Sequence, residues 1–442
     1  MSACVPASAP AGVTRGIRRW DLVAVAINGT IGAGIFGLPA RTFSLIGPYS
    51  LLAFVACALV VALIILCFAE VGSRYSESGG PYLYACEAFG PAAAFQVGWL
   101  QWLARLTAFA ANANLLVDYL AYFWPAAAAG GLRATVIGGA VILLTAVNIA
   151  GVRNAARLSN MFTIGKLVPL AIFVVTGMFF LHPAQYSFAV TPSYGNFSKA
   201  VLILIFAFTG FEMAVIPAGE IEDPRRNVPR ALLTALAVVT VFYVLIQVVC
   251  VGTLPELATS TRPIADATSR FLGDAGVTVI LFGAVMSVTG NLNVLILAGS
   301  RIPFAMALQR QLPAVLAATH PRFRTPHVAI VITAATVLTL ALSGTFLMLV
   351  TISAIARLLS YAATCAALPV LRRRGTAPPA AFTVPAGTAT AVAALVLCAW
   401  LLSNSSFEEA RNTAVAVAIG VIVYFLSRAF GARAEGSAGD PR

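Results

Sequence analysis

The sequence has few charged residues for its length, and this scarcity excludes a soluble globular protein. Only 10% of the 442 residues are Asp, Glu, Lys or Arg, whereas 60% are hydrophobic. Such a chain cannot provide the polar surface that covers a water-soluble fold. We therefore expect an all-α integral membrane protein.

Clustered cysteines and histidines are also missing, which argues against a metal centre. The seven cysteines form no CxxC pair, and the three histidines, His182, His320 and His327, fall in separate loops. Metal sites and disulfide frameworks need clustered side chains. We expect no metal and no disulfide, and we interpret the cysteines as small core residues.

The loops hold no catalytic signature. They contain no Ser/His/Asp set, no glycine-rich phosphate loop and no pair of catalytic carboxylates, and none could hold a catalytic domain. We expect that the protein is not an enzyme and uses no cofactor. The net charge of +12 is scattered over separate loops, so nucleic acid is not an expected partner.

Apolar runs of membrane-spanning length make up most of the chain. About 20 residues cross a hydrocarbon core of ~30 Å, and the first run is too long to be a cleaved signal peptide. Residues 1–19 and 430–442 are predicted to be cytoplasmic tails. We predict twelve spans, at 20–46, 49–71, 92–121, 132–150, 158–181, 199–219, 231–253, 271–300, 328–344, 346–371, 385–403 and 412–429.

The basic loop residues predict the orientation. An even number of spans puts both termini on one side, and most of the arginines lie on that side. The basic residues expected on the opposite side are Arg41, Arg133, Lys199, Arg262, Arg270 and Arg411. The positive-inside rule therefore predicts a multi-pass protein of the plasma (inner) membrane with both termini in the cytoplasm.

Two of the spans are interrupted by glycine and proline. Residues 28–39 read NGTIGAGIFGLP, and residues 208–217 read FTGFEMAVIP. An unpaired backbone group in hydrocarbon costs several kcal/mol, so an unwound segment persists only where it is buried in protein or lines a cavity. This pairing of breaks is typical of a transporter substrate site.

The breaks divide the chain into two halves of five spans, at residues 20–181 and 199–371. An odd number of crossings separates the breaks, so the halves would have opposite orientation, as in inverted-repeat carriers. We predict a 5+5 inverted repeat with discontinuous helices 1 and 6, followed by two C-terminal helices at 385–429. The halves share no visible sequence identity, so this prediction depends on hydropathy and on the breaks.

Four ordered motifs resemble those of the amino acid/polyamine/organocation (APC) superfamily, with its LeuT-type fold. They span helices one to ten, whereas spans 11 and 12 carry no signature. The resemblance implies a secondary active transporter of amino acids that works by alternating access. The motifs are GTIGAGIF at 29–36, EVGSRYSESGGPY at 70–82, FTGFE at 208–212 with GEIEDPRRNVPR at 219–230, and SR at 300–301 with AMA at 305–307 and LP at 312–313.

The breaks can bind both charged groups of a zwitterion. Free N–H groups at a half-helix N-terminus attract a carboxylate, and free carbonyls at a C-terminus attract an ammonium. The alternative is that the glycines only permit tight helix packing. The expected substrate contacts are Thr30, Ile31, Gly32, Ala33 and Gly34 in the first break, Phe206, Ala207 and Thr209 in the second, and Asn293 in span 8, where Asn291 is a second candidate.

The resemblance gives Phe206 a second role, because the family places an aromatic gate over bound substrate at this position. Without the resemblance, a core or lipid-facing phenylalanine would be the simpler interpretation, since the chain has 27 of them.

Lys166 and Glu212 are the candidates for proton coupling. Lys166 is one of two lysines among 28 basic residues, and a lysine buried in low dielectric can release its proton whereas arginine cannot. By resemblance to sodium-independent relatives, its ammonium would replace the cation that sodium-coupled relatives bind between spans 1, 5 and 8. The alternatives are a snorkelling lysine and, for Glu212, a carboxylate that caps the second break.

Three polar residues in the spans have no assigned role. Arg105 and Asn112 are seven residues apart and share a helical face, which suits a cavity wall, although Arg105 can equally pair with Glu70 or Glu212. Arg357 has no partner that the sequence identifies. If Arg105 reaches the pocket, an anionic or polar substrate becomes more favourable than a cationic one.

The sequence thus predicts proton-coupled, sodium-independent uptake of neutral amino acids. An amino acid/amine exchanger and a membrane sensor that binds the ligand without moving it are the alternatives. The expected partners are the amino acid, protons and the lipid bilayer, and no obligatory protein partner is inferred.

Overall fold

The computed structural model describes residues 15–32, 34–128, 130–343, 346–375, 377–403, 411, 413–425 and 427. These residues form helices, turns and one isolated β-bridge, without a strand. The α-helices are α1 (Arg19–Thr30), α2 (Gly34–Ile46), α3 (Ser50–Gly72), α4 (Pro81–Phe89), α5 (Pro91–Phe123), α6 (Gly130–Ile149), α7 (Val152–Gly177), α8 (Tyr194–Phe208), α9 (Pro224–Thr253), α10 (Pro263–Leu308), α11 (His327–Ser343), α12 (Phe346–Arg373) and α13 (Gly387–Ser403), followed by an apolar helix at 413–425.

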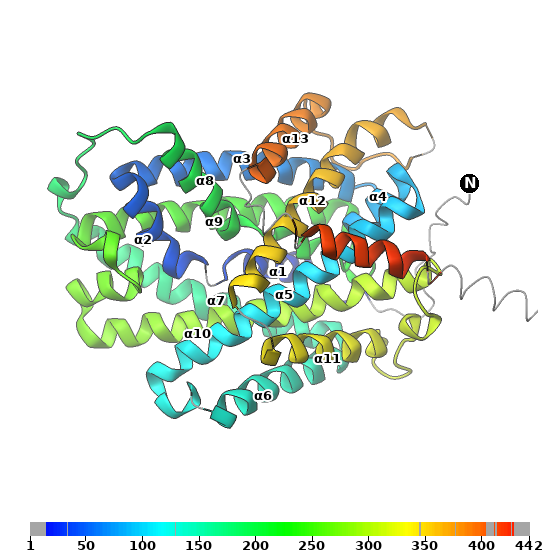
Figure 1. The fold of residues 1–442 in the computed structure, drawn as a ribbon, viewed down its shortest axis with the longest axis horizontal. Coiled ribbons are helices and arrows are strands. Elements are labelled where there is room, and N and C mark those ends of the chain that lie inside the picture. The colour runs from blue at the N-terminus through cyan, green and yellow to red at the C-terminus, as the bar shows by residue number, and fades with distance from the viewer. Residues whose placement is uncertain are drawn as a thin grey trace, which may run out of the picture.

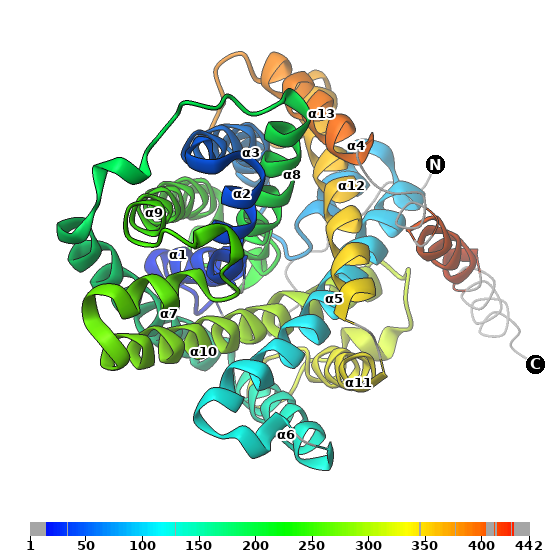
Figure 2. The ribbon, with the colours of Figure 1, turned by 60° about the vertical axis from the view of Figure 1, so that its left-hand side comes forward.

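The helices form one bundle with α1 in its interior (Figures 1 and 2). α1 packs against α7, α9 and α10, and α5 crosses both α10 and α12. Figure 2 shows α6 beside α11 at one edge of the bundle and α13 at another, next to α3 and α12. Residues 22–30 of α1 are all buried, as expected for an apolar segment enclosed by other helices.

Length and composition support a membrane protein. Seven helices in the described part of the chain are long and apolar enough to cross a bilayer, and three further apolar helices are shorter. α5 has sufficient length but carries buried polar side chains such as Gln101 and Arg105. The count of twelve crossings stays a prediction.

Three predicted spans differ in detail from the observed helices. The first, 20–46, is divided into α1 and α2, as its glycines predicted. The sixth, 199–219, is α-helical only as far as Phe208 and continues in two 3₁₀ turns, Phe211–Ala214 and Ala218–Glu220. The eighth extends from Pro263 to Leu308, with a bend at Gly273, whose φ of 60° suits a residue without a side chain.

The cysteines agree with the sequence-based expectation at five positions and differ at one. Cys57, Cys67, Cys250, Cys365 and Cys398 are free and buried. Cys86 is disulfide-bonded, so the expectation of no disulfide was wrong. The error arose because spacing along the chain does not report which cysteines meet in space.

The segment before α1 closes one end of the bundle. Ile17 forms an isolated parallel bridge with Ile221, and the carbonyl of Glu220 accepts hydrogen bonds from the N–H groups of Gly16 and Ile17 at 3.0 Å. The Glu220 carboxylate in turn accepts a bidentate pair from Arg301 of α10, at 2.7 and 2.9 Å. Both side chains are buried, so this ion pair joins α10 to the segment that follows α8.

A second buried carboxylate, Glu70, joins α3 to α12. It accepts two hydrogen bonds from Arg372, at 2.7 and 2.6 Å, and one from the N–H of Val384 at 2.7 Å. Glu70 is therefore satisfied at this end of the bundle and is not the partner of Arg105.

We predict that Arg301→Met lowers the stability of the protein by ~3–5 kcal/mol, because it leaves the Glu220 carboxylate buried without its cation. The measurement is the apparent melting temperature of the purified protein in detergent. The double variant Arg301→Met/Glu220→Gln should recover most of the loss. Arg270→Met is the matched control, since Arg270 pairs with Glu256 at an exposed site, where a pair contributes only ~0–1 kcal/mol. Equal melting temperatures for Arg301→Met and the unmodified protein would contradict the prediction.

Candidate functional site

The first break separates α1 from α2 at Ile31 and Gly32. Ile31 leaves the helix with extended backbone angles, and α2 begins at Gly34. A helix that stops leaves carbonyls without intrahelical partners, which must then find donors elsewhere. Residue 33 lies outside the described residues.

Side chains from α7, α9 and α10 supply those donors. Asn291 Nδ2 donates to the carbonyls of Asn28 and Gly29, both at 2.9 Å. Ser287 Oγ donates to the Ile31 carbonyl at 3.1 Å, and Tyr243 Oη to the Thr30 carbonyl at 3.3 Å. Hydrogen bonds from side chains of the neighbouring helices thus stabilise the interrupted backbone.

The second break follows α8 and depends on a glycine. Gly210 has a φ of 107°, a left-handed conformation that residues with a side chain rarely adopt. Its N–H donates to Glu212 Oε2 at 2.9 Å, while Thr209 Oγ1 donates back to the Phe206 carbonyl at 2.8 Å. Tyr243 Oη also lies 3.0 Å from the Ala207 carbonyl, so the single O–H of this α9 tyrosine is shared between acceptors of both breaks.

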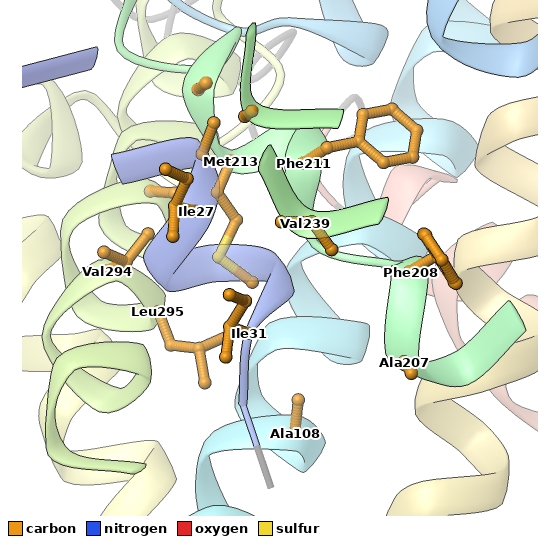
Figure 3. Close-up of a cluster of buried hydrophobic side chains, with 14 of the residues drawn as sticks. Ile27, Ile31, Ala108, Ala207, Phe208, Phe211, Met213, Val239, Val294 and Leu295 are labelled. Carbon is orange, nitrogen blue, oxygen red and sulfur yellow. The ribbon is translucent and has the colours of Figure 1, made fainter. Parts of the chain in front are cut away.

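The two breaks touch at glycines. A Cβ on Gly210 would come within 2.1 Å of the Gly29 carbonyl oxygen, and a Cβ on Gly29 within 2.4 Å of the Gly210 oxygen. No other residue type permits this approach. Figure 3 shows a cluster of buried apolar side chains that includes Ile31 from the first break and Phe208 and Phe211 from the second.

A small cavity of about 60 Å³ lies between the breaks. Its walls come from α1, α2, α5, α8, α10 and α12, and they are formed by Gly29, Thr30, Gly32, Gly34, Ala108, Ala111, Asn112, Leu115, Phe206, Ala207, Thr209, Asn291, Ser353 and Arg357.

Six of the residues predicted from the sequence line this cavity: Thr30, Gly32, Gly34, Phe206, Ala207 and Thr209. Ala33 lies outside the described residues. Ile31 is completely buried and does not line the cavity, although its carbonyl bonds to Ser287 and Lys166. Phe206 keeps 39% of its surface exposed, as a side chain beside an open space can.

Asn293 lies away from the cavity. Its Nδ2 donates to the Ala155 carbonyl of α7 at 3.0 Å, and its Oδ1 accepts from Asn148 of α6 at 3.0 Å. Asn291 lines the cavity instead and accepts a hydrogen bond from Asn112 of α5 at 3.1 Å. Two residues turn a helix by about 200°, so the two asparagines face opposite sides, which the sequence alone did not resolve.

Lys166 of α7 reaches the first break. Its side chain is completely buried, and Nζ donates to the Ile31 carbonyl at 2.5 Å and to the Ser287 carbonyl at 3.3 Å. No carboxylate among the described residues forms an ion pair with it. The ammonium therefore lies between α1, α7 and α10, bonded to backbone carbonyls as a bound cation would be.

Glu212 lies directly after the second break, beside Tyr361, Arg105 and Arg357. Of these, the sequence suggested only Arg105 as a possible partner. Its Oε2 accepts from Tyr361 Oη at 2.6 Å, in addition to the Gly210 N–H. Its Oε1 lies 3.5 Å from Arg105 Nη2 and 3.8 Å from Arg357 Nη1. The carboxylate thus caps the broken backbone and faces two arginines, one from α5 and one from α12.

Sequence reasoning missed four side chains of this site. Tyr243 lies on α9, Ser287 on α10, and Ser353 and Tyr361 on α12, and each is an isolated hydroxyl in an apolar segment. Nothing in their spacing distinguishes them from other hydroxyls of membrane helices. Arg357 was noted from the sequence, but its place in the cavity wall was not.

Comparison with known proteins agrees with this architecture. A family model described as amino acid permease matches residues 17–425. The chain is 27% identical over 435 residues to the methylthioribose transporter of Bacillus subtilis (strain 168), covering 94% of this chain and 93% of that protein. It is 29% identical over 413 residues to the serine/threonine exchanger SteT of the same organism, covering 89% and 92%. It is 30% identical over 420 residues to the Asc-type amino acid transporter 1 of Mus musculus, covering 91% and 79%.

We predict that Gly34→Val raises the dissociation constant of the ligand about tenfold or more, since overpacking of this size costs ~1–3 kcal/mol. A Cβ at Gly34 would already lie 3.3 Å from the Ala207 backbone, on the wall of the cavity. Ligand binding to purified protein is the measurement. Gly37→Val is the matched control on α2, because a Cβ there meets nothing within 4 Å. Unaltered affinity in Gly34→Val would move the binding site elsewhere.

Proposed function

The chain belongs to the amino acid permease family, and from this premise we propose that it is a secondary active transporter that carries amino acids across a membrane by alternating access. The observation that supports this function is the contact of two interrupted helices at one cavity. Main-chain groups released at both breaks lie in its wall, where an amino acid can replace the hydrogen bonds that the helices have lost.

The zwitterion would bind with its carboxylate at the start of α2 and its ammonium at the end of α8. The first N–H groups of α2 have no intrahelical acceptor, and Gly32 and Gly34 add no side chain that would block an approach. The carbonyls of Phe206 and Ala207 each accept one hydrogen bond already. A carbonyl oxygen has two lone pairs, so each can also accept from an ammonium.

Alternating access follows from an inverted repeat of residues 20–181 and 199–371, with residues 385–429 outside it. In this proposal, the bridge between Ile17 and Ile221 and the pair of Arg301 with Glu220 keep the cytoplasmic end closed. Rocking of one half against the other would separate them and open that end. Both termini would then lie in the cytoplasm, and the protein in the plasma (inner) membrane.

Lys166 would make the transporter independent of sodium. Its ammonium bonds to the Ile31 carbonyl, at the place where a cation would otherwise hold the first break. Because lysine can exchange its proton in a dry site, protonation and deprotonation would strengthen and weaken the link between α7 and α1. Glu212, beside the second break, would be the second group in this coupling.

We propose neutral amino acids as the principal substrates. No carboxylate lines the described wall of the cavity, so a cationic side chain would find no ionic partner there. Exchange is the alternative transport mode, and the relative SteT is named as a serine/threonine exchanger. Counterflow without a pH gradient separates exchange from proton-driven uptake.

The test is uptake of labelled amino acids into vesicles that contain the purified protein. An imposed inward proton gradient should drive accumulation, with or without sodium. Binding without accumulation under any gradient would identify a sensor and overturn the proposal.

We predict that Lys166→Ala abolishes the response of uptake to the pH gradient and retains part of the ligand binding. The ammonium is lost from the first break, whereas the cavity wall is left intact. Lys199→Ala is the matched control, because this second lysine is exposed on α8. A Lys166→Ala variant with the pH dependence of the unmodified protein would remove the lysine from the coupling mechanism.

We predict that Phe206→Ala slows transport more than it weakens binding, because an aromatic ring that covers the ligand acts during occlusion. Initial uptake rates and equilibrium binding are measured on the same preparation. Phe282→Ala, at an exposed phenylalanine of α10, gives the effect of removing a ring far from the cavity. Full transport by Phe206→Ala would reduce its role to packing.

A further inference from the structure

The buried charges beside the cavity do not balance. Arg105 and Arg357 face a single carboxylate, Glu212, and all three side chains are at least nine-tenths buried. A buried charge is costly unless an opposite charge compensates it. The cluster therefore carries one uncompensated positive charge.

The hydrogen bonds of the cluster are also incomplete. Glu212 Oε1 has no hydrogen bond, because both guanidinium groups stay beyond bonding distance. Arg357 donates through Nη1 to Thr209 Oγ1 at 3.2 Å, while its buried Nε has no acceptor. A guanidinium has five N–H donors, so most of the donor capacity of Arg357 is unused.

Of the two arginines, only Arg357 lines the cavity. Arg105 donates to the Gln101 carbonyl of its own helix and lies behind the wall. Arg357 bonds to Thr209 at the edge of the second break. Ser353, one turn before Arg357 on α12, and the small residues Ala108 and Ala111 of α5 also line the cavity. Because α5 and α12 are continuous helices, the side chain of an amino acid held at the breaks would extend toward them.

We infer that Arg357 forms a side-chain subsite for an acceptor oxygen, so that the transporter prefers amino acids whose side chain ends in a carboxamide, a hydroxyl or a carboxylate. This inference rests on the proposed function. It narrows the neutral substrates to those with a polar side chain and adds a short side-chain carboxylate as a further ligand. A neutral acceptor completes the unused hydrogen bonds of Arg357. A short carboxylate also compensates the excess positive charge, whereas a cationic side chain increases it.

Because the cluster has one excess positive charge, removing one arginine should not leave a buried charge without its partner. Arg357→Met removes the excess cation and leaves Arg105 beside Glu212 as a balanced pair, so the fold should tolerate it. Arg357→Lys keeps the charge but loses the planar fork that suits acceptor oxygens. Arg270→Met is the control for loss of an arginine, since Arg270 lies in an exposed pair far from the cavity.

The experiment measures the binding of four amino acids to each purified protein. Leucine, asparagine and aspartate have similar size and differ in their terminal atoms, and alanine reports on the main-chain contacts alone. The unmodified protein should bind asparagine and aspartate about tenfold or more tighter than leucine, as a charge-assisted hydrogen bond implies. Tighter binding of aspartate than of asparagine would show that the excess positive charge also attracts the ligand.

In Arg357→Met, the dissociation constants of asparagine and aspartate should lie within about threefold of that of leucine. The affinity for alanine and the melting temperature should be retained. Arg357→Lys should keep part of the preference for aspartate and lose that for asparagine. Equal loss for all four ligands, or an unchanged preference, would overturn the inference. If the unmodified protein binds amino acids without favouring acceptor oxygens, the inference fails while the proposed function stands. If it binds none of the four, both fail.

Discussion

The structure depends on the satisfaction of backbone groups where two helices are interrupted inside an apolar bundle. A continuous helix satisfies its own peptide groups, and an interrupted one requires donors and acceptors from its neighbours. Here Asn291, Ser287 and Lys166 bond to the first break, Glu212 and Tyr361 to the second, and Tyr243 to both. Glu212 lies in the second break itself, and the other side chains come from α7, α9, α10 and α12, so the bundle is built around the two breaks.

The glycine contact explains why the breaks meet. Gly29 and Gly210 approach so closely that a methyl group on either would overlap the backbone of the other. Half-helix ends with opposite partial charges are thereby held at one cavity, which suits a small zwitterion. The same geometry connects the first break to Lys166, because the Lys166 ammonium donates a hydrogen bond to the Ile31 carbonyl.

Charge is distributed unequally around this centre. The pairs of Glu70 with Arg372 and of Glu220 with Arg301 have short bidentate geometry and join helices at one end of the bundle. The Glu212 cluster is looser, with both arginines at 3.5 Å or more and several donors without partners. Well-paired charges stabilise the fold, whereas the incompletely paired cluster beside the cavity leaves capacity for a ligand.

The sequence by itself determined the class of the protein, the positions of both breaks and the part of the cavity wall that the breaks form. Hydropathy and glycine act locally, so a run of apolar residues and a helix interruption are visible in one dimension. Only the tertiary structure decided that Asn291 and not Asn293 faces the cavity, that Arg105 meets Glu212 and not Glu70, and that Arg357 reaches the wall. Those outcomes depend on the rotation of each helix about its axis. That rotation is set by packing between segments far apart in the chain, and the uniformly apolar faces of membrane helices do not encode it.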